Sequence, residues 1–199
     1  MKSRTLLTLT MLLITSGLLV AQASFQLKDS KISIQGTSNI HDWESAVTQV
    51  KAEGTLTVED NLLKALPALK VTMAVEGIES SKGSVMDKKT YKALLYEEHP
   101  NIIFELKKLT GLKPTADQQN LTASGNLTIA GTTKLVDMKV IAEKTAAGDF
   151  RFTGSKALKM TDFNMEPPTA LFGSLKTGDD VTVTFDITLT SDSDTSSLK

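Results

Sequence analysis

The stretch Val181-Thr-Val-Thr-Phe-Asp-Ile-Thr-Leu-Thr190 alternates strictly between apolar and polar side chains. A period of two is typical of a β-strand with one buried face and one solvent-facing face. The stretch Leu121-Thr-Ala-Ser-Gly-Asn-Leu-Thr-Ile129 alternates in the same way, with Gly125 on its apolar face. The two stretches therefore predict strands of a sheet that covers one apolar core.

Shorter alternating segments extend this pattern over most of the chain: Phe25 to Ile34, Val47 to Val58, Leu69 to Val75, Ile102 to Leu106, Val136 to Val140, and Phe150 to Phe152. Residues 130–133 (AGTT) and 147–149 (AGD) are short and contain glycine, so they predict hairpin connections. Residues 176–179 (KTGD) predict a turn before the last strand. About eight strands with tight connections indicate an antiparallel barrel or sandwich.

One segment lacks this alternation, from Ser84 to Glu98. Met86, Tyr91, Leu94 and Leu95 recur there near helical spacing, and His99-Pro100 follows. This spacing predicts a short amphipathic helix. A single helix among many strands excludes a parallel, doubly wound sheet, so the predicted fold is all-β with one short helix.

The N-terminus has the three regions of a secretory signal peptide. Lys2 and Arg4 precede an apolar core of about 15 residues at 6–20, and Ala21-Gln22-Ala23 supplies small residues for cleavage after Ala23. That core is short for a membrane-spanning helix, which needs about 20 residues. The chain has no cysteine, which rules out a lipoprotein anchor and disulfides. We therefore expect an exported protein.

The expected division is a signal peptide at 1–23, one domain at 24–190 and a polar tail at 191–199. Removing Lys2 and Arg4 changes the formal net charge from −1 to −3. A chain of this charge has no basic surface large enough to follow a phosphate backbone. Nucleic acid is therefore excluded as an expected partner.

Residues for catalysis are scarce. The chain has two histidines and no cysteine. His41 and Asp42 are adjacent, and adjacent strand residues face opposite ways, which does not suit a base and its orienting carboxylate. His41 and His99 lack a zinc-site spacing. We predict no enzyme, no catalytic residue and no metal. The weakest alternative is an enzyme in which one histidine faces a carboxylate.

Aromatic and methionine side chains gather in the predicted helix and after Met160: Met86, Tyr91, Tyr96, Phe163, Met165 and Phe172. Methionine adapts to apolar ligands of varied shape. The interior of an eight-stranded barrel can hold one small ligand or be filled by side chains. These residues could accordingly line a pocket or plug the end of the barrel.

Five segments, in order along the chain, resemble the YceI family of exported, lipocalin-like, polyisoprenoid-binding proteins. They are Gly36-Thr-Ser-Asn-Ile-His-Asp-Trp43; Ile78-Glu-Ser with Met86-Asp-Lys-Lys-Thr-Tyr-Lys-Ala-Leu94; His99-Pro-Asn-Ile-Ile-Phe104; Gly125-Asn-Leu-Thr-Ile-Ala-Gly-Thr-Thr133; and Leu158 to Pro168 with Gly173 and Gly178-Asp179. The third begins with histidine where the family more often has tyrosine or phenylalanine.

This resemblance implies an extended eight-stranded antiparallel lipocalin-like barrel, closed by a helix, around an apolar channel. The lining residues that the resemblance implies are His41, Trp43, Tyr91, Leu94, Leu95, Phe104, Phe163 and Met165. Met86 and Phe172, from the aromatic and methionine set above, complete the expected ligand-binding residues. The implied protein is a periplasmic carrier or sequestering protein for an isoprenoid lipid or quinone, with no other cofactor. It would contact membrane surfaces transiently, and a homodimer is left open. The alternative is a ligand-free structural or stress-associated envelope protein that acts through surface contacts.

Overall fold

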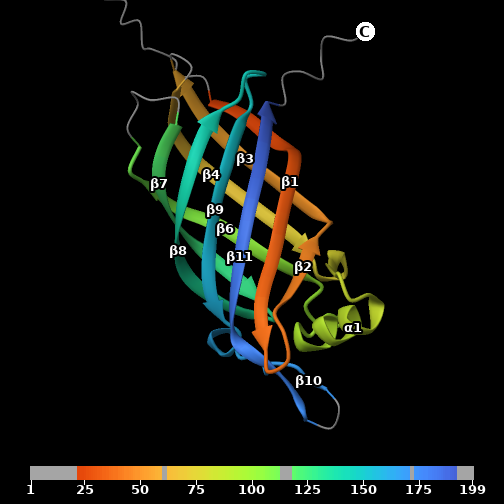
Figure 1. Ribbon diagram of the computed structural model, residues 1–199. Coiled ribbons are helices and arrows are strands. Elements are labelled where there is room, and N and C mark those ends of the chain that lie inside the picture. The colour runs from red at the N-terminus through yellow and green to blue at the C-terminus, as the bar shows by residue number, and fades with distance from the viewer. Residues whose placement is uncertain (1–21, 60–61, 113–117, 171–172, 192–199) are drawn as a thin grey trace, which may run out of the picture.

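A computed structural model describes residues 22–59, 62–112, 118–170 and 173–191. It shows an elongated β-barrel with one α-helix at one end (Figure 1). The predicted signal peptide up to residue 21 and the predicted tail from 192 onward lie outside the described residues. No described helix is both long enough and apolar enough to cross a membrane.

Eight antiparallel strands form the closed wall: β1 (Gln22–Ser38), β3 (Val50–Glu59), β4 (Leu62–Ala74), β6 (Asn101–Thr110), β7 (Gln118–Ile129), β8 (Thr132–Lys144), β9 (Phe150–Lys159) and β11 (Leu175–Ser191). Each strand pairs with the next in this order, and β11 pairs with β1 to close the barrel. The predicted all-β fold with an eight-stranded antiparallel barrel and one short helix is confirmed.

Strand β1 has two successive partners along one edge. It pairs with β3 near its start and with β2 (Trp43–Val47) from Ile32 to Gly36. A short strand β5 (Ile78–Ser80) adds to β2. The single strand predicted from Val47 to Val58 was wrong, because the chain bends at Thr48 and Gln49. The backbone N–H of Thr48 donates to the Gly77 carbonyl at 2.7 Å, a contact that depends on a distant segment.

The hairpins at residues 130–133 and 147–149 are confirmed. Ala130 and Gly131 join β7 to β8 with φ values of 46° and 76°. Positive φ at both central residues matches the right-handed twist of the flanking strands. The turn predicted at residues 176–179 was wrong, because β11 runs through it and pairs there with β10 (Thr169–Ala170) and with β1.

Helix α1 (Ser84–Ala93) is shorter than predicted, because the chain turns after Leu94. Leu95 adopts a left-handed conformation with φ 53°. Its N–H donates to the Lys92 carbonyl at 3.2 Å, and the Tyr96 N–H donates to the Tyr91 carbonyl at 3.0 Å. This pair of bonds is a Schellman motif, which ends a helix and satisfies its last carbonyl groups. Two 3₁₀ turns, η1 (Val75–Gly77) and η2 (Thr161–Phe163), complete the described structure.

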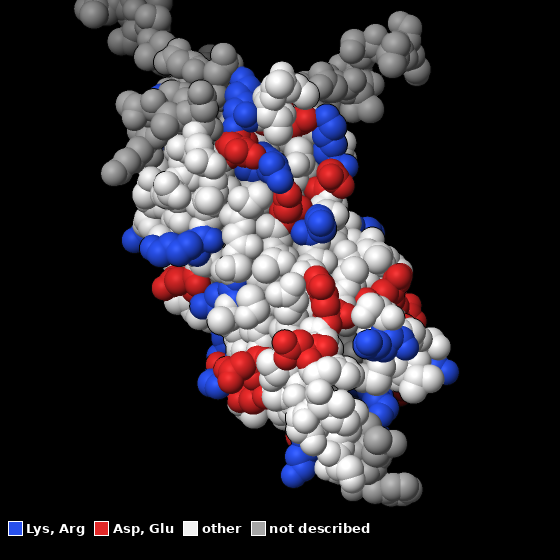
Figure 2. Space-filling view, in the orientation of Figure 1, with Lys and Arg blue, Asp and Glu red and all other residues white. Residues whose placement is uncertain are grey.

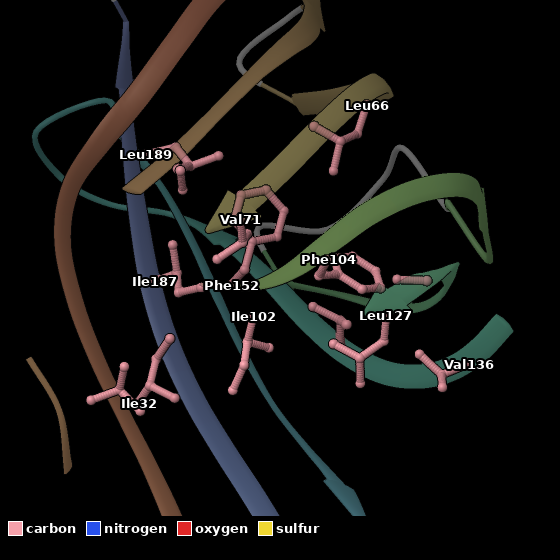
Figure 3. Packing of buried hydrophobic residues seen from close by; sticks show 14 of the residues in the cluster. Ile32, Leu66, Val71, Ile102, Phe104, Leu127, Val136, Phe152, Ile187 and Leu189 are labelled. Atoms are coloured by element: carbon pink, nitrogen blue, oxygen red, sulfur yellow. The ribbon is translucent and has the colours of Figure 1, made fainter. Parts of the chain in front are cut away.

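Apolar side chains from opposite walls converge inside the barrel (Figure 3). Figure 3 shows Val71, Phe152, Ile187 and Leu189, from three different strands, pointing toward a common interior. The alternating residues of β11 face inward as predicted, and Leu189 is completely buried. Burial of this continuous apolar face stabilises the fold, since about 25 cal/mol is gained for each Å² removed from water.

A half-buried ion pair joins the hairpin after β8 to strand β1. The register of β1 shifts between Leu27 and Asp29, and Lys28 at this bulge donates to Asp149 at 2.6 Å. The Asp149 side chain is 9% exposed. Hydrogen bonds from Lys28 and Thr190 lower the pKa of Asp149 below its ordinary value of 3.8.

Asp149→Asn is expected to destabilise the protein by about 1–2 kcal/mol at neutral pH, because a hydrogen bond to a charged group is lost. A carboxylate with a lowered folded-state pKa contributes stability above its unfolded-state pKa and loses it as the pH falls through the folded-state value. The difference in stability between the two proteins should therefore narrow as the pH falls below the ordinary carboxyl pKa of 3.8, and it should close once the pH is below the folded-state pKa. Urea unfolding across this range measures it, and a gap that persists at the lowest pH would contradict the assignment. Asp180→Asn is the control, since the Asp180 side chain is 80% exposed.

Candidate functional site: an apolar cavity with one polar end

The barrel encloses a cavity of about 450 Å³. Its wall combines side chains of β1, β2, β4, β5, β6, β7, β8, β9 and β11. The middle of the wall is mostly apolar and includes Ile34, Leu69, Phe104, Met138 and Val183. The inward period of two along each strand produces this lining, because alternate residues of a barrel strand face the interior.

The barrel is packed solid at the end away from α1. Phe25 and Phe150 meet edge to face there, with ring centroids 6.2 Å apart. Leu56 on β3, next to β1, and Leu63 on β4, next to β3, are almost completely buried at this end. These four residues are not part of the cavity lining. We call this group the plug.

The other end of the cavity is polar. Ser38, His41, Lys82, Lys89, Lys159 and Thr177 line it. Figure 1 shows α1, the β1–β2 connection and β10 together at this end. We call it the mouth. Lys159 is held on the rim by Asp180 at 2.7 Å, and this carboxylate raises the pKa of Lys159.

Helix α1 covers the mouth without burying any of its own residues. Met86, Thr90 and Ala93 face the cavity. The neighbouring side is fixed by two hydrogen bonds to the wall: the Tyr91 hydroxyl donates to the Glu76 carbonyl at 2.9 Å, and the Ser80 N–H donates to Asp87 at 2.6 Å. The helix is thus attached along one edge.

Most of the residues predicted for the site come together in the structure. The cavity lining includes His41, Trp43, Met86, Leu94, Phe104, Phe163 and Met165. Tyr91 and Leu95 are not in the lining: Tyr91 faces η1, and Leu95 is 47% exposed. Phe172 lies outside the described residues. The predicted residues that line the cavity differ in solvent exposure: Phe163 is 2% exposed, whereas His41 is on the surface.

Three aromatic rings in the lining lie against glycines on neighbouring strands. A Cβ built on Gly36 would lie 2.3 Å from the Trp43 ring, one on Gly125 would lie 2.5 Å from Phe104, and one on Gly154 would lie 2.6 Å from Phe185. Each ring therefore occupies the space that a side chain on the glycine would take.

This arrangement keeps the rings against the wall and leaves the middle of the barrel open. The sequence prediction missed Phe185 as a site residue, and it also missed the role of the glycines. The sequence contains only part of the information needed to find these pairs. Gly125 and Phe185 lie at inward positions of alternating stretches, but the residues they pack against are set by strand register.

The geometry offers little for catalysis. A ring nitrogen of His41 lies 2.9 Å from the Asp42 carbonyl oxygen, and both residues are exposed in the β1–β2 connection. His99 instead packs beside Gly131. Within the described ranges, no three His, Asp or Glu residues come close enough to hold a metal ion. What the site provides is an apolar surface, with polar groups at its mouth.

The fold and the cavity define a small β-barrel protein with a hollow apolar interior that is plugged at one end. The chain matches the YceI-like domain family over residues 22–189 and belongs to this family. No curated protein matches it in sequence.

Solved structures with low sequence identity share the fold. Burkholderia cenocepacia BcnA is 17% identical, with a TM-score of 0.63 over 81% of this chain and 96% of that one. A polyisoprenoid binding domain from Saccharophagus degradans, implicated in plant cell wall breakdown, is 11% identical, with a TM-score of 0.65 over 85% of this chain and 99% of that one. The Campylobacter jejuni YCEI protein is 17% identical, with a TM-score of 0.53 over 96% of this chain and 99% of that one.

Proposed function

We propose that this protein binds one long apolar lipid in the barrel and acts as its carrier or sequestering protein. The observation that carries this proposal is the apolar cavity of about 450 Å³. Each methylene that moves from water into such a cavity contributes about 0.8 kcal/mol, so a long hydrocarbon binds without any catalytic group. The polar mouth accommodates the polar head of the same molecule.

The proposed ligand is a polyisoprenoid or an isoprenoid quinone. Membership of the YceI-like domain family supports this, together with the shared fold of the Saccharophagus degradans domain, which is described as polyisoprenoid binding. Methionine at Met73, Met86, Met138 and Met165 in the lining suits a branched, flexible chain. The proposed location is the periplasm, and the signal-peptide pattern at residues 1–23 supports export.

The competing function is a structural envelope protein with a filled barrel. The cavity favours the carrier, because a filled barrel would leave no apolar space between the plug and the mouth. The proposal is tested by native mass spectrometry of protein purified from its own cell envelope, followed by organic extraction. We expect a lipid adduct of one molecule for each chain. An empty protein that also rejects isoprenoid quinones and long-chain lipids would overturn the proposal.

Trp43 gives a direct binding measurement, because it is the only tryptophan of the chain and lies in the cavity lining. Its ring nitrogen donates to the Thr37 carbonyl at 3.0 Å, which fixes the ring at the mouth. Titration of delipidated protein with an isoprenoid quinone is expected to quench Trp43 fluorescence to saturation. A quinone that copurifies or binds without any change in this emission would contradict the placement of the chain in the cavity.

A further inference from the structure

We propose that the outer face of α1 docks the mouth of the barrel onto an anionic lipid bilayer. The proposal rests on the proposed function for its purpose, which is the exchange of lipid with a membrane. The residues that test the surface, Val85, Lys88, Lys92 and Ile40, do not line the cavity. Four features of this end of the molecule carry the argument.

The first feature is a basic helix face. Val85, Lys88, Lys89 and Lys92 are spaced at i, i+3, i+4 and i+7 and therefore share one face of α1. Lys82 precedes the helix on the same side of the mouth. In the described part of the chain, these lysines form no ion pair, unlike Lys28, Lys107 and Lys159 elsewhere in the barrel.

The second feature is the absence of acidic groups from that face. Asp87, the only acidic residue of α1, points back to the wall and accepts the Ser80 N–H. Glu97 and Glu98 follow beyond the C-terminal end of the helix. Figure 2 shows basic side chains at the lower right, where Figure 1 places α1, with acidic side chains directly above them.

The third feature is apolar. Val85 is 70% exposed in the middle of the lysines, and Ile40 is 60% exposed at the tip of the β1–β2 connection. Ser38 and His41, on either side of Ile40, line the mouth. Two exposed apolar side chains beside a basic helix face fit a lipid surface better than a polyanion such as nucleic acid, because only a bilayer offers both headgroup charge and a hydrocarbon interior.

The fourth feature is position. Met86 and Ala93 of the same helix face the cavity, so the docking face borders the side that covers the mouth. A lipid that leaves a bilayer beneath α1 would reach the apolar wall with little exposure to water. The docking surface and the route into the cavity therefore coincide.

Cosedimentation with vesicles tests the proposal on the full mature protein. The vesicles are an equimolar mixture of phosphatidylglycerol and phosphatidylcholine, compared with pure phosphatidylcholine. We expect binding to the anionic vesicles only, weakened by added salt. The double variant Lys88→Glu and Lys92→Glu should bind the anionic vesicles at least about tenfold more weakly. Each lysine near an anionic surface contributes to the attraction, and each glutamate that replaces it is repelled by the same surface.

Lys64→Glu with Lys108→Glu is the matched control. It changes the charge equally on strands β4 and β6, toward the plugged end, and should keep full vesicle binding. Lys88 and Lys92 do not line the cavity, so the α1 variant should also keep its lipid adduct in native mass spectrometry. Loss of vesicle binding with the adduct retained supports docking by α1.

Three results would overturn the proposal: no binding to anionic vesicles, equal binding to both kinds of vesicle, or equal loss in the α1 variant and the control. None of them bears on whether the cavity holds lipid, so this proposal and the proposed function fail separately. Val85→Ser with Ile40→Ser provides a second variant. It should weaken the binding that remains in high salt, and unchanged binding would show that the apolar residues take no part.

Discussion

Replacement of Ala123 by phenylalanine is expected to weaken the binding of an isoprenoid quinone about a hundredfold while the barrel still folds. Ala123 lies on β7 in the cavity lining, between Leu109 of β6 and Met138 of β8. A phenyl ring there displaces several methylenes of a bound chain. At about 0.8 kcal/mol each, the loss of three or four amounts to about 3 kcal/mol, or roughly two orders of magnitude in Kd.

The free energy of unfolding should change by less than about 1 kcal/mol, since the ring enters open space and does not overpack a filled core. Asn126→Phe is the control, because it adds the same ring on the outer face of β7 next to Leu135. Titration of Trp43 fluorescence gives the affinities, and urea unfolding gives the stabilities. If Ala123→Phe bound quinone as tightly as Asn126→Phe, the ligand would not lie in the middle of the barrel.

Leu56→Ala is expected to destabilise the protein by about 2–5 kcal/mol, the usual cost of truncating a fully buried leucine. Leu56 has 0% exposure and belongs to the plug. Leu69→Ala should cost only about 1 kcal/mol, because Leu69 lines the cavity and part of its surface has no protein neighbour to lose. The same chemical change thus reports the packing at two depths of the barrel.

Binding should follow the reverse order. Leu69→Ala removes part of the wall that a bound chain contacts, whereas Leu56→Ala leaves the lining intact. Urea unfolding of the delipidated proteins and quinone titration together measure both effects. Equal destabilisation by the two substitutions would indicate a barrel that is packed solid from end to end and would favour the structural envelope protein.

The sequence was sufficient for the wall of the barrel, because alternation depends only on local spacing and on which face is buried. It was insufficient for the bend at Thr48 and Gln49, which the Gly77 carbonyl stabilises from a distant segment. It also missed the end of α1, since Leu95 takes the left-handed conformation that usually requires glycine.

The site was predictable in its residue types and less so in its geometry. The inward position of Phe104 follows from alternation, and Trp43 was expected in the lining from the family resemblance. The rotation of α1 does not, because Asp87 and Tyr91 set it through bonds to Ser80 and Glu76, and this turns Tyr91 away from the cavity. Whether the barrel is hollow depends on which aromatic ring packs against which glycine on the neighbouring strand. This pairing cannot be predicted from the sequence of one strand alone.

The plug has a consequence for the order of events in lipid exchange. In the proposed lipid exchange, a barrel that is closed at one end would admit a chain tail first and release it head first, so the polar head would face the membrane that receives the lipid. Each further carbon in the chain adds contact with the apolar wall that must be lost before the chain is free, so release would slow as the chain lengthens. The depth between mouth and plug would thereby limit the length of chain that fits in the cavity. A longer chain would have to fold back or leave its end outside.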